Sequence, residues 1–264
     1  EAWFSITDPA QSGWAMSSAL LGCIFGALIS GWCADKLGRK LPLILSAVLF
    51  SASAWGTAVA SHFDMFVVYR IVGGVGIGLA SALSPLYIAE VSPAEKRGRF
   101  VAVNQLTIVI GVLAAQLINL MIAEPVEPGA TQQMIVDSWN GQMGWRWMFG
   151  AELVPALAFL VLMFFVPESP RWLMKAGKPE RARAALERIG SADYADRILR
   201  EIAHTLEKDN NKVSYGALLA PQVKPIVIIG MVLAIFQQWC GINVIFNYAQ
   251  EIFASAGFDI NSTL

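Results

Sequence analysis

The sequence predicts an all-α, polytopic membrane protein, and three observations lead to this fold class. Of the 264 residues, 56% are hydrophobic and only 15% are charged, whereas soluble domains carry about 25% charged residues. Six apolar stretches are long enough to cross a bilayer. Basic residues gather in alternate connections between these stretches, as they do in cytoplasmic loops. The net charge of −1 argues against nucleic acid as a partner and leaves the lipid bilayer as the expected surroundings.

The six predicted spans follow one another with short connections until a long polar segment separates the last two. They lie between residues 8 and 35, 40 and 64, 65 and 89, 99 and 124, 147 and 166, and 225 and 250. The third contains Arg70 and the fifth contains Glu152, whereas the sixth carries no charge. Within the polar segment, 177–190 and about 192–206 have the charged, amphipathic pattern of two short helices.

The distribution of charge sets the expected orientation of the spans. Every lysine and arginine except Arg70 and Arg146 falls near residues 36–40, 96–99 or 171–224. Cytoplasmic loops carry the Lys/Arg excess of membrane proteins, so these three connections are expected on the cytoplasmic side. Three tryptophans near residue 145 form the aromatic belt expected at the opposite interface.

Four motifs add chemistry to this pattern. They are GWCADKLGRK at 31–40, PLYIAEVSPAEKRGR at 85–99, PESPRWL at 167–173 and QQWCGIN at 237–243. In the first motif, Asp35 is expected to cap the start of the following helix, and Gly38 is expected to allow a tight turn. The glycine-rich run 73–81 superficially resembles a dinucleotide loop, but it lies within a span and predicts close helix packing instead.

Together the four motifs, in this order, resemble the sugar porter family of the major facilitator superfamily. The resemblance implies a major facilitator fold, with this chain a fragment that covers helices 2–7 of an expected 12. Residues 1–168 would form the N-terminal bundle, 169–222 a cytoplasmic helical linker, and 223–264 helix 7. The implied function is secondary active transport of a neutral monosaccharide, xylose- or glucose-like, by alternating access. Coupling to H+ as a symporter is the first expectation, and a passive sugar facilitator or a non-transporting sugar sensor is the alternative.

The resemblance also implies a location and excludes other chemistry. A member of this family is a multi-pass integral protein of the plasma (inner) membrane. The sequence shows no nucleophile–base pair, metal cluster or cofactor motif, so we expect no enzyme activity, catalytic residue, metal or cofactor.

A cytoplasmic charge network is the first site that the resemblance implies. It would close the inner gate when the protein opens outward. Ordinary surface ion pairs, worth about 0–1 kcal/mol each, are the alternative. The residues that match the family pattern are Asp35, Arg39, Glu90, Arg97, Glu168 and Arg171.

Carboxamides in the sixth span predict the second site. Amide groups both donate and accept hydrogen bonds without carrying charge, which suits a sugar ring, and polar groups within a span indicate function. On a helical wheel Gln238 lies about 100° and Asn243 about 120° from Gln237. One straight helix therefore cannot aim all three at one small ligand. Either some face neighbouring helices, or the helix breaks near Gly241.

The resemblance implies the break near Gly241, with Gln237, Gln238 and Asn243 all on the sugar. It adds Gln105 of the fourth span as a further sugar-binding residue. Asn247 and Tyr248 stand where the family usually carries two tyrosines, so they are weaker candidates for the pocket or its outer edge.

Arg70 is the candidate for proton coupling. The resemblance pairs it with an aspartate on helix 1 whose protonation drives symport. The alternative is that Arg70 extends to the outer membrane interface, as long basic side chains do.

Overall fold

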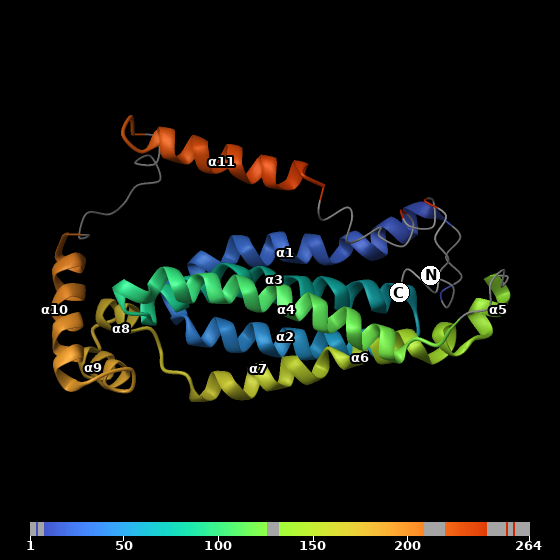
Figure 1. The fold of residues 1–264 in the computed structure, drawn as a ribbon, viewed down its shortest axis with the longest axis horizontal. Coiled ribbons are helices and arrows are strands. Elements are labelled where there is room, and N and C mark those ends of the chain that lie inside the picture. Colours follow the sequence, from blue (N-terminus) through green and yellow to red (C-terminus); the bar gives the residue numbers. More distant parts are fainter. Residues whose placement is uncertain are drawn as a thin grey trace. The chain divides into compact units, whose positions relative to one another are not determined.

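The computed structural model describes residues 4, 8–125, 132–208, 220–241, 252 and 256. The chain divides into two compact units, Glu1–Leu199 and Arg200–Leu264. Among the described residues, six helices of the first unit run along one another (Figure 1). They are α1 (Pro9–Leu37), α2 (Lys40–Ala58), α3 (Phe63–Val91), α4 (Arg97–Ile122), α6 (Trp145–Ala151) and α7 (Leu153–Phe165). Five helical segments of the described chain are long and apolar enough to cross a membrane. They confirm five of the six predicted spans.

The sixth predicted span begins as α11 (Lys224–Trp239) in the second unit. This helix is apolar and has 16 residues. Residues 242–250, the remainder of the predicted span, lie outside the described residues.

Glycines bring α1 and α3 close together. A Cβ atom added to Gly22 or Gly26 of α1 would overlap the backbone of α3, and one added to Gly74 or Gly78 would overlap the backbone of α1. Small residues permit this close approach of helices in membranes. The structure therefore confirms close packing as the role of the glycine-rich run 73–81.

The core of the first unit lies where α1, α2, α3 and α7 meet. Cys33, Leu43, Leu83 and Met163, one from each of these helices, are at most 6% exposed and belong to one cluster. Because lipid tails are as apolar as these side chains, close packing rather than hydrophobic transfer holds such contacts together in a bilayer.

Helix α4 packs differently from its neighbours. It contacts α3 and α6, but none of its residues is buried. Its apolar side chains, such as Leu106, Leu113 and Met121, are more than half exposed. The helix is therefore attached along one side and open along the rest.

At the end of the bundle away from α8, polar contacts join three helices. A π-helical turn, Asn140–Gly144, precedes α6 after the short α5 (Gln132–Asp137). The Asn140 side chain donates to the Glu124 carbonyl at 2.6 Å and accepts from the Glu124 amide at 2.9 Å. Arg146 Nη1 donates to the Ala58 carbonyl at the end of α2 at 2.8 Å. These contacts fix the start of α6 against α4 and α2.

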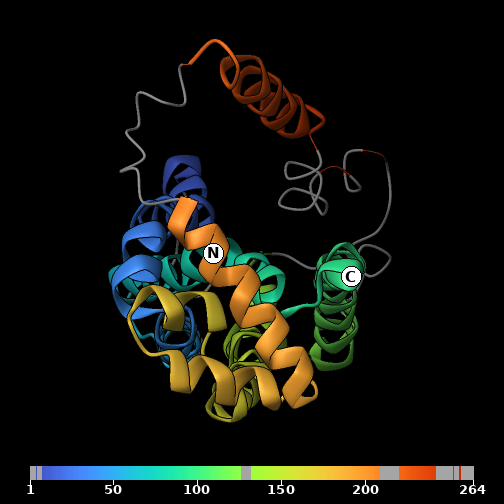
Figure 2. The same ribbon diagram turned by 90° about the vertical axis from the view of Figure 1, so that its left-hand side faces the viewer.

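Two short helices cover the opposite end of the bundle, as Figure 2 shows: α8 (Pro170–Lys175) and α9 (Pro179–Glu187). The side chain of Ser169 caps α8 by accepting from the Trp172 amide at 3.3 Å. A third helix, α10 (Ala192–Lys208), follows. α9 and α10 confirm the two helices that the sequence predicts in the polar segment.

Candidate functional site

A buried ion pair lies at the centre of the predicted charge network. Arg39 is in the turn between α1 and α2, and Glu90 is near the end of α3. Arg39 Nη2 donates to Glu90 Oε1 at 2.8 Å, with the two side chains only 11% and 9% exposed. Arg39 Nη1 also donates to the Ala34 carbonyl at 2.8 Å. The arginine thus joins the end of α1 to the end of α3.

The turn that presents Arg39 depends on Gly38. Its φ of 89° lies in the region that disfavours residues with a Cβ atom. A Cβ atom there would also overlap the Glu168 carboxylate. The tight turn predicted at Gly38 is therefore confirmed, and Glu168 packs against it.

Glu168 caps the start of α2. Its Oε1 accepts hydrogen bonds from the backbone amides of Arg39 at 2.9 Å, Lys40 at 3.2 Å and Ser169 at 2.7 Å. A carboxylate at a helix N-terminus satisfies free N–H groups and interacts favourably with the helix dipole. Glu168 therefore ties the end of the α7 segment to the start of α2.

The expectation that Asp35 caps this helix is wrong. Helix α1 continues to Leu37, so Asp35 lies within its last turn. The Asp35 carboxylate instead pairs with Lys175 of α8 at 3.2 Å, and both side chains are at least 60% exposed. An exposed pair of this kind contributes little to stability.

The other two predicted network residues lie at exposed positions. Arg97 begins α4, and within the described part of the chain it forms no ion pair. Arg171 lies in α8 and is exposed. The structure thus brings Arg39, Glu90 and Glu168 together, and it leaves Asp35, Arg97 and Arg171 at the rim of this end.

Two further residues, which the sequence analysis did not single out, hold the same end together. Tyr87 Oη donates to the Pro167 carbonyl at 2.7 Å, linking α3 to the segment before α8. Trp172 Nε1 donates to the Asp35 carbonyl at 3.0 Å, linking α8 to α1. Both lie inside the motifs at 85–99 and 167–173, but their partners are about 80 and 137 residues away, and no local pattern indicates such pairing.

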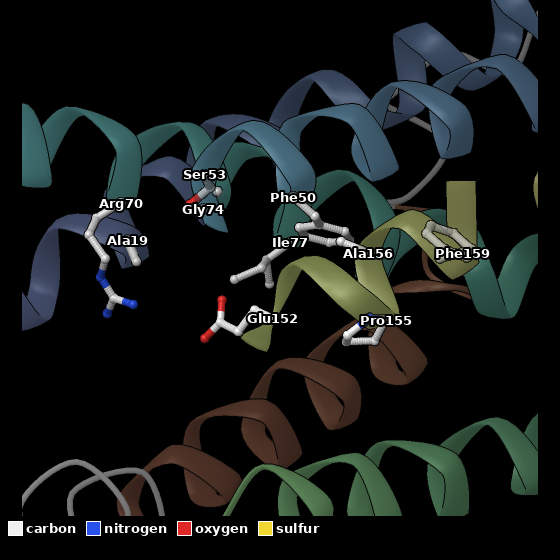
Figure 3. A pocket seen from close by; sticks show the side chains of 11 residues that line it. Ala19, Phe50, Ser53, Arg70, Gly74, Ile77, Glu152, Pro155, Ala156 and Phe159 are labelled. Carbon is white, nitrogen blue, oxygen red and sulfur yellow. The ribbon is translucent and has the colours of Figure 1, made fainter. Parts of the chain in front are cut away.

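Arg70 points from α3 into a cavity of about 400 Å³ within the first unit (Figure 3). Glu152, between α6 and α7, lines the same cavity. Among the described residues no ion pair joins Arg70 to Glu152. Arg70 Nε is buried and lacks a hydrogen-bond partner, and Arg70 Cζ lies 5.8 Å from the centroid of the Phe149 ring. The side chains of Arg70 and Glu152 therefore line one mostly apolar cavity, and the Nε–H group of Arg70 has no acceptor among the described residues there.

The predicted sugar-binding carboxamides are spread over both units. Gln105 is exposed on α4 of the first unit, whereas Gln237 and Gln238 are exposed in the last turn of α11 in the second. α11 ends at Trp239, and Gly241 has a φ of 76°. Asn243, Asn247 and Tyr248 lie outside the described residues. The helix thus stops just before the glycine at which the sequence analysis expects a break.

These groups suit recognition of an uncharged ligand better than bond-making chemistry. Carboxamides supply paired donors and acceptors in an apolar setting. The described residues contain no cluster of His, Cys, Asp and Glu that could hold a metal ion. The charged groups Arg39, Glu90 and Glu168 join helix ends to one another.

Comparison with known proteins gives consistent matches along nearly the whole chain. The family described as "Sugar (and other) transporter" matches residues 5–263. The D-xylose-proton symporter of Escherichia coli (strain K12) is 41% identical over 263 residues, which cover 93% of this chain and 51% of the symporter. The glucose transport protein of Synechocystis sp. is 42% identical over 261 residues, covering 98% of this chain and 54% of that protein.

The solved structures that match are also transporters. A structure of the proton:xylose symporter XylE bound to 6-bromo-6-deoxy-D-glucose aligns with a TM-score of 0.83 and 38% identity, covering 99% of this chain and 57% of XylE. The partially occluded, inward-open XylE from E. coli aligns with a TM-score of 0.77 and 37% identity over 93% of this chain and 58% of XylE. This chain spans about half the length of the curated relatives it matches, and these relatives are named as transporters, not as enzymes.

Proposed function

Because the chain belongs to the sugar porter family of the major facilitator superfamily, we propose that the full-length protein carries a neutral monosaccharide across the membrane by alternating access. The chain is a multi-pass integral membrane protein with the major facilitator fold, and its placement in the plasma (inner) membrane follows from its similarity to XylE. The observation that carries the proposal is the placement of uncharged carboxamides, rather than charged groups, on exposed faces of two apolar helices, α4 and α11.

The substrate we propose is a pentose or hexose. Relatives over more than nine-tenths of this chain are named for D-xylose, glucose and arabinose. Gln105 of α4 and Gln237 and Gln238 of α11 supply donors and acceptors suited to ring hydroxyls. Gln105 belongs to the first unit, and Gln237 and Gln238 belong to the second.

The break near Gly241 belongs to the same proposal. A φ of 76° directly after the last turn of α11 redirects the chain. Such a change of direction would allow Asn243 to reach a ligand that Gln237 and Gln238 also contact, as discontinuous helices do at transporter sites. Asn247 and Tyr248 would lie farther along and line the outer edge.

For the inner gate we propose the charged end of the first unit. Arg39, Glu90 and Glu168 form its fixed part, since buried contacts join them to three helix ends. Asp35, Arg97 and Arg171 lie exposed around this centre, where partners can be exchanged when the bundles move. Residues 1–168, 169–222 and 223–264 would then act as N-terminal bundle, linker and the start of the C-terminal bundle.

Proton coupling is the finer part of the proposal. Arg70 faces Glu152 across the cavity of about 400 Å³, and its buried Nε lacks a hydrogen-bond partner, so the guanidinium can donate to the carboxylate of an acid that approaches it. Protonation of such an acid would release the arginine. The D-xylose-proton and arabinose-proton symporters among the relatives support this coupling. A passive facilitator remains the second candidate, because the similarity to the Synechocystis glucose transport protein supports sugar transport without specifying a coupling ion.

Counterflow in proteoliposomes containing the purified full-length protein tests this proposal. With unlabelled xylose or glucose inside, labelled sugar is expected to accumulate transiently from outside. In a separate assay, sugar is added outside sugar-free vesicles with a pH indicator in the outer medium. This separates the two candidates, because symport into the vesicles removes protons from the medium and makes it more alkaline, whereas passive transport does not. Binding of sugar without counterflow would indicate a sensor, and the absence of both binding and counterflow would reject the proposal.

A further inference from the structure

A second pocket lies at the charged end of the first unit, apart from the cavity of Arg70. Its volume is about 440 Å³, and α8, α9 and the segment after α7 enclose it. Three basic side chains line it, Lys178, Arg181 and Arg188, together with the Trp172 ring and the single acid Glu168. The Glu168 carboxylate is already engaged by backbone amides of α2. The charge that remains in the pocket is therefore positive.

The two faces of α9 show that this positive charge is specific to the pocket. Arg183, on the face away from the pocket, pairs with Glu187 at 3.0 Å and with Asp196 at 3.2 Å. Arg181 and Arg188 line the pocket, seven residues apart and on one face of the helix. Within the part of the chain that the structure describes, no acid pairs with either of them. Acidic residues thus neutralise one face of α9 and leave the other cationic.

The pocket begins where the chain leaves its fifth membrane-length helical segment. Arg188 Nη2 donates to the carbonyl of Phe165 at 2.9 Å, and Phe165 is the last residue of the span that starts at Asn140. The side chains of Leu162, Phe164 and Phe165 are 62–69% exposed on α7 beside this point. An apolar surface for acyl chains therefore leads directly to a cluster of cations.

We infer that this pocket binds the phosphate headgroup of an anionic phospholipid from the cytoplasmic leaflet. Arginine guanidinium groups bind phosphate oxygens through two parallel hydrogen bonds, and basic pockets at the cytoplasmic side of membrane helices suit lipid headgroups. The exposed apolar end of α7 favours a lipid over free phosphate, because only a lipid has chains to cover it. A bound headgroup would connect α9 to the end of α7, next to Glu168.

Binding of phosphatidylglycerol to the purified full-length protein in detergent tests the inference, with phosphatidylcholine of the same acyl chains as the neutral lipid. Phosphatidylglycerol is expected to raise the unfolding temperature, since a ligand that binds only the folded state stabilises it. The variant Arg181→Gln should bind phosphatidylglycerol about tenfold more weakly. Arg181 is exposed and makes no hydrogen bond within the described residues, so the substitution is expected to leave folding unchanged.

Arg183→Gln is the matched control, because it removes the same charge from the opposite face of α9. It should bind phosphatidylglycerol as the unmodified protein does, and Arg188→Lys, which keeps the charge, should retain most of the affinity. Equal binding of phosphatidylglycerol and phosphatidylcholine, or equal losses in Arg181→Gln and Arg183→Gln, would overturn the inference. Stabilisation by millimolar inorganic phosphate alone would also overturn it, because the ligand would then be a free anion.

Discussion

Helices α3 and α4 are both long and apolar, with 29 and 26 residues, yet they pack in opposite ways. Both lie in membrane-length helical segments of 29 residues, Phe63–Val91 and Ala94–Ile122. In the most apolar stretch of the first segment 44% of the residues are buried, whereas in that of the second none is buried. The surroundings of their glycines differ in the same way. Gly74 and Gly78 of α3 lie against the backbone of α1, whereas Gly98 and Gly111 of α4 have open space where a Cβ atom would be. Hydropathy therefore predicts that both cross the membrane, but it does not distinguish the helix that packs closely on its neighbour from the one that does not.

The contrast extends to the polar residues that the two helices carry. Glu90 of α3 is 9% exposed and paired with Arg39. Gln105 of α4 is exposed, so its amide is available to a ligand. In the proposed alternating-access cycle, α3 would stay fixed within its bundle while α4 presents Gln105 to the substrate.

The largest effect is expected at the charged ends of the two helices. Arg39→Ala leaves Glu90 buried without its partner, which should lower the free energy of unfolding by about 3–5 kcal/mol. Arg97→Ala removes an exposed arginine at the start of α4 and should change it by less than about 0.5 kcal/mol. Thermal or denaturant unfolding of both variants in the same detergent measures the difference. Equal stability of the two variants would mean that the Arg39–Glu90 contact does not hold α3 in place.

A smaller effect on stability is expected from substituting the glycines of α3, compared with those of α4. Gly74→Ala forces α1 and α3 apart, because the new methyl group overlaps the Ala19 carbonyl and Gly22, and should cost about 1–3 kcal/mol. Gly111→Ala in α4 meets nothing within 4 Å and should be neutral or slightly stabilising, since alanine favours the helix. The two unfolding curves decide the matter, and a destabilised Gly111→Ala with an unchanged Gly74→Ala would reverse the comparison.

Much of this architecture could be predicted from the sequence because it depends on local patterns. Apolar length gave five of the described spans, and Pro179 and Gly190 framed α9 closely. The turn at Gly38 followed from the residue type alone. The glycine-rich run 73–81 likewise indicated close packing before its partner helix was known.

What could not be predicted depends on residues far apart in the chain. Asp35 was the nearest acid to the start of α2, so a local rule assigned it the cap. Because α1 continues through Leu37, that side chain belongs to the preceding helix, and Glu168, separated from Arg39 by 129 residues, takes the position instead. The exposure of α4 could not be predicted either, because its amino-acid composition resembles that of a closely packed span.

Sugar affinity of Gln105→Ala in the full-length protein tests the central claim, that the exposed amides form the substrate site. We expect about a tenfold weaker Kd for the preferred pentose or hexose, about 1.4 kcal/mol, because one hydrogen-bonding amide is lost. Unfolding should be unchanged, since Gln105 is exposed. Thr107→Ala, which removes a hydroxyl bonded to the Val103 carbonyl on the same helix, should bind sugar normally. Unchanged sugar binding by Gln105→Ala, measured by calorimetry beside that control, would contradict the account.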